Sequence, residues 1–201
     1  MQIRLFIVIL FCFVTKITYA QQKISCSFLN NSRLCISGTS NIVPYRLTQD
    51  FTEFLEKNLT FTAKKVENKI YLSTDKLSIP VKNFNSDNPL ILPDFRKLMK
   101  YEQYPFLNIN LLFIETDEEN LNSDKTSGNI YVNITIAGQT RQMKIPVLAV
   151  NNSNVMNICG QRKLNIRDFG LQPPVDPFGI IKVNEWIKID FNIRLKYALI
   201  N

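Results

Sequence analysis

The last part of the chain, residues 181–197, reads IKVNEWIKIDFNIRLKY and alternates between apolar and polar side chains. Successive side chains of a β-strand point to opposite faces of a sheet, so this period of two predicts a strand with one buried and one solvated face. Only Glu185 interrupts the apolar series. Because typical strands have about five or six residues, a strand of this length predicts a strongly coiled sheet or a closed barrel.

The first 20 residues have the pattern of a secretory signal peptide. Arg4 supplies a positive charge, residues 5–14 form an apolar run, and the small residues Thr18 and Ala20 occupy the positions that a signal peptidase recognises. A run of this length is too short for a spanning helix, which needs about 20 residues. A buried N-terminal element is the alternative. We expect residues 21–201 to form a single periplasmic or secreted domain that does not span a membrane.

The charge of the chain is mildly basic and dispersed. It has 24 Lys and Arg and 17 Asp and Glu, a formal net charge of +7, and Arg4 and Lys16 belong to the segment that would be removed. The basic residues form no run of the kind that marks a nucleic-acid surface, so we expect no nucleic-acid partner. Hydrophobic residues make up 45% of the chain, which is enough for a substantial core.

Two cysteines near the start of the domain invite a disulfide prediction. Counting outward from a two-residue turn at Asn30-Asn31 places Cys26 opposite Cys35 in a hairpin of residues 23–29 and 33–43, at a pair where side chains approach closely. A cross-strand disulfide and two separate small apolar side chains both fit this pattern. Cys159 could pair with either of the others or remain a buried thiol.

Most of the remaining chain also predicts strands, joined by short turns. Gly138 provides the positive φ that a tight turn at residues 137–140 requires. Residues 44–56 are less regular, and residues 116–125 form an acidic loop. The further strands are expected at residues 59–66, 69–82, 106–115, 130–136, 143–149 and 155–166.

One segment changes to helical periodicity. Pro93 stands at its start, and Phe95, Leu98, Met99 and Glu102 share one face at helical spacing. We expect this helix to lie over a mouth or seam of the barrel. The predicted fold is therefore an all-β, antiparallel, lipocalin-like barrel of about eight strands with one short α-helix.

The sequence offers little for catalysis. It contains no histidine, which removes the commonest general base and the commonest metal ligand. Residues 168–170 spell Asp-Phe-Gly, but no glycine-rich loop accompanies this kinase-like triplet, and a turn at Gly170 explains it. The carboxylates of Asp117, Glu118 and Glu119 fit a solvated loop better than a catalytic pair. We expect no enzyme activity, no metal site and no cofactor other than a bound lipid.

Five segments in a fixed order resemble a known family. They are SGTSNIV (37–43), IPVKNF (79–84), PDFRKLMKYEQYPFLNINL (93–111), GNIYVNITIAGQTRQMKIPV (128–147) and IRDFGLQPP (166–174). This set resembles the exported YceI-like family of lipocalin-like barrels, and the resemblance covers nearly all of residues 21–201. It implies that the barrel binds a polyisoprenoid, an isoprenoid quinone or a related lipid for transport, storage or stress protection in the cell envelope.

The alternating strands supply candidate residues for the wall of a lipid cavity. An eight-stranded barrel can be filled by its own side chains or can hold one small ligand. Alternation reports burial and not emptiness, so the alternative is an exported structural or interaction module with a filled barrel and no ligand; the resemblance favours the ligand. The candidate lining residues are Ile109, Leu111, Phe113, Ile130, Val132, Ile134, Ile187, Ile189, Phe191 and Ile193.

Overall fold

The computed structural model describes residues 22–55, 58–74, 76–116, 124–174, 180 and 182–200. The predicted signal peptide lies outside these residues, as do residues 117–123 of the predicted acidic loop. No helix in the described part of the chain combines the length and the apolar character needed to cross a bilayer.

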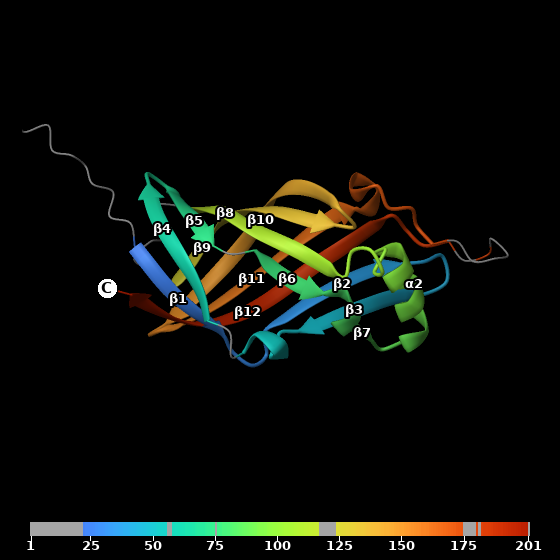
Figure 1. The fold of residues 1–201 in the computed structure, drawn as a ribbon, viewed down its shortest axis with the longest axis horizontal. Coiled ribbons are helices and arrows are strands. Elements are labelled where there is room, and N and C mark those ends of the chain that lie inside the picture. Colours follow the sequence, from blue (N-terminus) through green and yellow to red (C-terminus); the bar gives the residue numbers. More distant parts are fainter. Residues whose placement is uncertain are drawn as a thin grey trace, which may run out of the picture.

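Within the described residues, eight antiparallel strands form a closed ring, because the last strand pairs with the first (Figure 1). This ring confirms the prediction of an antiparallel barrel with about eight strands. In order around the ring, the strands are β1 (Gln22–Phe28), β4 (Asn58–Val66), β5 (Lys69–Thr74), β8 (Phe106–Thr116), β9 (Lys125–Ile136), β10 (Gln139–Asn152), β11 (Val155–Asn165) and β12 (Trp186–Ile200).

A second set of strands widens the barrel at the end away from the C-terminus. Residues 195–200 of β12 pair with β1, whereas residues 188–192 pair with β2 (Arg33–Thr39). The sheet then continues through β3 (Pro44–Asp50) to β7 (Asn85–Ser86). On the opposite side, β6 (Leu77–Pro80) pairs with the first half of β8. Along one edge, β12 therefore pairs first with β2 and then with β1, and along one edge β8 pairs first with β6 and then with β5. Strands β6 and β7 do not pair with each other, and the barrel opens between them.

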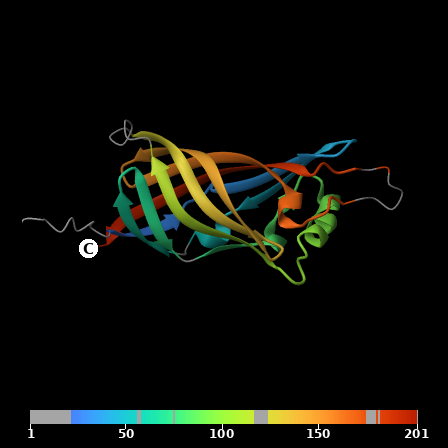
Figure 2. The same cartoon turned by 90° about the horizontal axis from the view of Figure 1, so that it is seen from above.

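Short helices cover this wider end. The chain passes from β6 through the 3-10 helix η2 (Val81–Asn83) to β7, and then through η3 (Pro89–Ile91) into α2 (Leu92–Leu98). Figure 2 shows α2 lying alongside the barrel at the end opposite the C-terminus. The position of α2 agrees with the prediction that the helix lies over the mouth or seam, although it is shorter than residues 93–102. Two further 3-10 helices are η1 (Thr52–Phe54) and η5 (Ile166–Phe169).

The predicted first hairpin is wrong, and of the two alternatives for its cysteines the structure contradicts the disulfide. Strands β1 and β2 do not pair with each other, because β12 lies between them. Arg194 of β12 lies where β1 and β2 diverge. Its backbone carbonyl accepts from Leu29 N at 2.8 Å, and its N–H donates to Ser32 Oγ at 3.0 Å. Cys26 therefore faces Tyr197, while Cys35 lies opposite Asp190 on the other side of β12. Both thiols are free, as is the exposed Cys159.

Two other predicted hairpins are confirmed. Strands β4 and β5 pair across a turn at residues 67–68, where Glu67 has a φ of 54°. Strands β9 and β10 pair over their whole predicted length. In their turn, Ala137 and Gly138 have φ values of 46° and 80°, which is the pair of positive φ angles that a type I′ turn needs.

Several predicted strand boundaries shift. The strand predicted over residues 69–82 is divided into β5 and β6, and the irregular region 44–56 contains the regular strand β3 followed by η1. The last strand begins at Trp186 instead of Ile181, and before it Val183 makes a single bridge to Ser40. Glu185, the one residue that interrupts the apolar alternation, directly precedes the observed start of the strand.

A bulge in β8 reverses the alternation in the middle of that strand. Leu111 pairs with Val132, but Phe113 pairs with Tyr131, so Leu112 is the extra residue. Phe113 consequently points to the outer face, where its ring stacks on Tyr131 at 4.2 Å and contacts Tyr71 at 5.4 Å between centroids. The prediction that Phe113 belongs to the inner face is therefore wrong.

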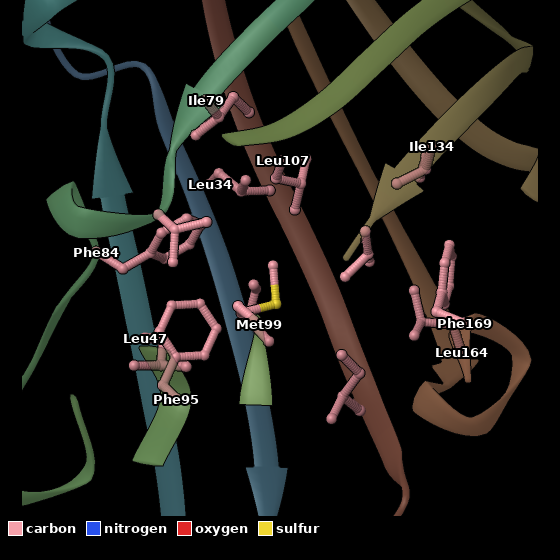
Figure 3. Packing of buried hydrophobic residues seen from close by; sticks show 14 of the residues in the cluster. Leu34, Leu47, Ile79, Phe84, Phe95, Met99, Leu107, Ile134, Leu164 and Phe169 are labelled. Carbon is pink, nitrogen blue, oxygen red and sulfur yellow. The ribbon is translucent and has the colours of Figure 1, made fainter. Parts of the chain in front are cut away.

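Three of the most deeply buried side chains of the described core lie where β6, η2 and β7 cross the wide end. Ile79 and Val81 are 0% exposed and Phe84 is 1% exposed. The ring of Phe84 meets that of Phe95 from α2 at a centroid distance of 5.2 Å. Figure 3 shows these two rings next to Leu47, with Phe169 beside Leu164 on the other side of the core. The crossing segment and α2 thus complete a core that the sheet alone leaves open.

Candidate functional site: an apolar cavity beside α2

An apolar cavity of about 380 Å³ lies between α2 and the inner face of the sheet. Its lining comes from the β2–β3 hairpin, the segment from β7 to the C-terminal turn of α2, the starts of β8 and β12, the end of β9, and the segment that follows β11. Pockets that bind small molecules typically have volumes of about 300–1,000 Å³. Among the apolar side chains of its lining are Ile36, Leu47, Phe95, Met99, Phe169, Leu171, Ile187 and Ile189.

The alternation of β2, β3 and β12 directs these side chains inward. Ile36 pairs with both Leu47 and Ile189 across neighbouring strands, so all three lie on one face of the sheet. On the opposite side, Phe95 and Met99 are four residues apart and project from the same face of α2 and its C-terminal turn. The cavity is therefore the space between the apolar inner face of the sheet and a short helix.

Polar groups gather at the mouth of the cavity, and the chain's own backbone engages two of them. Ser40 Oγ accepts from Val43 N at 3.0 Å, and Asn88 Oδ1 accepts from Leu90 N at 3.2 Å. Tyr45 is also part of the lining, and burial raises the pKa of its phenol. Asp94 is the one carboxylate in the described lining, and it is exposed.

The mouth is held together by contacts between the β2–β3 turn and the segment that leads into β12. Asn41 Nδ2 donates to the carbonyl of Ile180 at 2.9 Å, and Asn41 Oδ1 accepts from Lys182 N at 2.8 Å. Asn184 N donates to the Thr39 carbonyl at 2.8 Å. Two segments far apart in the sequence thus form one continuous edge of the opening.

The site provides shape and apolar surface but little reactive chemistry. No group of three Cys, Asp or Glu side chains that could hold a metal ion occurs in the described ranges. The described lining pairs no nucleophile with a base. An arrangement of this kind can bury an apolar chain and leave a polar end in water.

The ten predicted lining residues are spread over several environments. Ile187 and Ile189 line the cavity. Val132 and Ile134 are buried in the filled core. Phe113 lies on the outer face, as described above. The remaining residues are half-buried and pack against the core: Ile109, Leu111, Ile130, Phe191 and Ile193. The contact of a ligand with any of the ten residues stays a prediction.

Sequence reasoning missed most of the cavity wall. Leu47 belongs to β3, which was expected to be irregular, although the series Tyr45, Leu47 and Gln49 already points to a single inner face. Phe95 and Met99 were placed on one face of a helix over the mouth, and this signal could have located the cavity. No local pattern indicated Phe169 and Leu171, which reach the cavity because η5 turns the chain back under β12.

The fold and the cavity define a class of protein: a closed antiparallel barrel with an apolar cavity at one covered end. The YceI-like domain model matches residues 31–195. The chain therefore belongs to the YceI-like family, which confirms the resemblance seen in its sequence.

Two solved structures share the fold. A polyisoprenoid binding domain from Saccharophagus degradans, implicated in plant cell wall breakdown, has a TM-score of 0.61 at 10% identity and covers 87% of this chain and 98% of that one. BcnA from Burkholderia cenocepacia has a TM-score of 0.56 at 16% identity and covers 83% of this chain and 96% of that one. No curated protein sequence matches the chain. At these identities the likeness is one of fold.

Proposed function

We propose that the protein binds a long-chain apolar amphiphile, such as a polyisoprenoid, an isoprenoid quinone or a related lipid, and does so without catalysis. The observation that carries this proposal is the apolar cavity of about 380 Å³ beside α2. The polyisoprenoid binding domain with the same fold supports the ligand class.

The physical driving force is burial of the apolar chain. Each buried methylene contributes about 0.8 kcal/mol, so a tail of several carbons binds without directed hydrogen bonds. The polar end of the amphiphile then lies at the mouth, near Ser40, Tyr45 and Asn88. This orientation avoids placing a polar headgroup against the apolar wall, which would be unfavourable.

The signal peptide expected at residues 1–20 would place this binding in the periplasm or outside the cell. There, the protein would transport or store the lipid, or protect it during stress. A carrier of this kind shields the apolar tail from water between two membrane locations.

The second candidate is an exported structural or interaction module that binds no ligand. It is favoured by the nearly complete burial of Ile79, Val81 and Phe84, because these side chains occupy part of the interior at the wide end. The two candidates differ in whether the cavity is occupied in the cell.

The test is to purify the exported protein without detergent, extract it with organic solvent, and identify bound lipids by mass spectrometry. We expect about one long-chain lipid per protein molecule. Ile189→Trp should remove that lipid, because Ile189 lines the cavity and the indole ring would occupy part of it.

Leu195→Trp is the matched control, since Leu195 lies on the same strand and face but outside the cavity lining and is not one of the ten predicted lining residues. Circular dichroism establishes whether both variants are folded. Absence of any extracted lipid from the wild type would favour the module without a ligand. A folded Ile189→Trp variant that keeps its full lipid load would exclude this cavity as the binding site.

A further inference from the structure

The surface around the cavity mouth is unusually apolar. We define the rim as Ile42, Val43, Leu90 and Ile180, which are 58%, 53%, 82% and 65% exposed. Among the described large apolar side chains, only Leu199, at 56%, is also more than half exposed, and it lies on β12 near the C-terminus. Val43 and Leu90 also line the cavity. Exposed apolar side chains thus concentrate where a lipid would have to enter.

The rim has a defined geometry. Ile42 and Val43 are at the tip of the β2–β3 hairpin, where Ser40 Oγ accepts from both of their N–H groups at 3.2 and 3.0 Å. Asn41 at the same tip binds the backbone of Ile180 and Lys182. Exposed apolar side chains that cluster in this way are typical of interaction sites.

A basic groove adjoins the rim on the outer side of the wall. It shares Tyr45, Asn88 and Ile187 with the cavity, so the two sites are separated only by the wall that these residues form. Arg46, Arg162, Lys163 and Lys188 line the groove, and Asp87 is the one carboxylate in its described lining. The groove therefore carries positive charge directly beside the apolar opening.

An exposed tryptophan lies in the same groove. Trp186 is 45% exposed, and the Lys163 ammonium lies 5.2 Å from the centre of its ring. Tryptophan and basic residues are both typical of surfaces at the boundary between water and lipid headgroups. Apolar insertion at the rim and attraction of anions at the groove are complementary features of one surface.

We propose that the rim and the basic groove together dock this end of the molecule onto an anionic lipid bilayer. The rim side chains enter the headgroup region, and Arg46, Lys163 and Lys188 contact anionic headgroups. An apolar tail then passes from the bilayer into the cavity without crossing water. This inference rests on the proposed function for its purpose, but docking itself is measured separately from lipid loading.

The experiment uses flotation of the exported protein with vesicles of equal amounts of phosphatidylcholine and phosphatidylglycerol, compared with vesicles of phosphatidylcholine alone. We expect binding to the anionic vesicles that weakens with added salt. Leu90→Asp should weaken that binding at least about tenfold, because it replaces an inserted apolar side chain with a charge. Leu199→Asp is the control, because Leu199 is also more than half exposed but lies near the C-terminus, away from the rim, and it should leave binding unchanged.

A matched pair of lysine variants tests how much the basic groove contributes to vesicle binding. Lys188→Gln should weaken binding to anionic vesicles, whereas Lys196→Gln should not, although both lysines are exposed on the same face of β12. Only Lys188 lies in the basic groove.

Three results would overturn the proposal. They are absence of binding to anionic vesicles, equal binding by Leu90→Asp and the wild type, and self-association that Leu90→Asp abolishes while vesicles are not bound. The last result would assign the rim to a second copy of the chain. Lipid extraction separates the two inferences. If the protein carries lipid but does not bind vesicles, the docking proposal is refuted and the proposed lipid binding is not. If the protein binds vesicles but carries no lipid, the proposed role of the cavity is refuted and docking is not.

Discussion

The two ends of the barrel use the same alternation of side chains to different effect. At the α2 end, inner side chains such as Ile79 and Val81 are fully buried, and others line the cavity. At the end formed by β1, β4 and β5, the inner-facing Ile24, Phe61 and Ile70 are only half-buried. The difference arises because β6, η2 and α2 cover one end, whereas the described residues provide no equivalent cover for the other. Burial of the inner side chains at each end therefore depends more on the segments that cover that end than on the strands themselves.

Truncating one phenylalanine at each end should give the largest effect on stability. Phe84→Ala should destabilise the protein by about 3–5 kcal/mol, because it removes a fully buried ring that packs on Phe95. Phe61→Ala should have less than half of that effect, since Phe61 is half-buried. Urea denaturation measures both. Equal losses would mean that the two ends are equally packed.

A smaller effect is expected at Gly160, in the wall between the two ends. A Cβ at this position would lie 2.6 Å from the Phe191 ring and 2.9 Å from the Pro146 carbonyl oxygen. Gly160→Ala should therefore destabilise the protein by about 1–3 kcal/mol, because a backbone atom as well as a ring must move. Thermal unfolding measures the change. An unchanged Tm would show that β10 and β11 can separate locally without loss.

The start of β12 at the α2 end offers a small electrostatic prediction. The Arg167 guanidinium and the Asn165 amide both donate to the carboxylate of Glu185 and hold its pKa below the ordinary value. Arg167→Gln should raise the pKa of Glu185 towards that value, which an NMR titration would detect. Any stability from this contact is present above the ordinary pKa and declines as the pH falls. An unaltered titration in the variant would show that the pair does not persist in solution.

The smallest expected effect is that of a reducing agent on the Tm, which tests whether a disulfide joins β1 to β2. Because Cys26 and Cys35 lie on different sides of β12 and are free, a reducing agent should leave the Tm unchanged. The Cys26→Ala/Cys35→Ala double variant should likewise unfold at the same temperature with and without reductant. A drop in Tm on reduction of the wild type alone would reveal a disulfide and a different register for β1 and β2.

Local patterns predicted much of the fold. The turns at residues 67–68 and 137–138 depend on neighbouring residues and on the φ values they adopt, so the sequence was sufficient there. The α2 helix was also visible, from Pro93 and the shared face of Phe95 and Met99. The prediction of the first hairpin was wrong for a different reason. Its turn was correctly located, but Arg194, distant in the sequence, supplies the hydrogen bonds that a hairpin partner would otherwise make.

The cavity was harder to predict for the same reason. Ile187 and Ile189 were correctly placed on an inner face, yet their neighbours in the lining come from β3, α2 and η5. Alternation gave no sign that Leu112 would form a bulge and turn Phe113 outward. Whether the interior is packed or leaves a cavity depends on how β6, η2 and α2 cross the wide end, and alternation within a strand does not report this.

The sequence by itself determined that this chain forms amphipathic strands, where most of them turn, and that one helix covers the sheet, because these properties follow from side-chain periodicity and local backbone preferences. Tertiary structure alone decided that β12 separates β1 from β2 and that the free space lies beside α2. Strand partners and cavities are set by contacts between distant segments, and a period of two is the same whichever strand lies alongside and whether or not the space inside is filled.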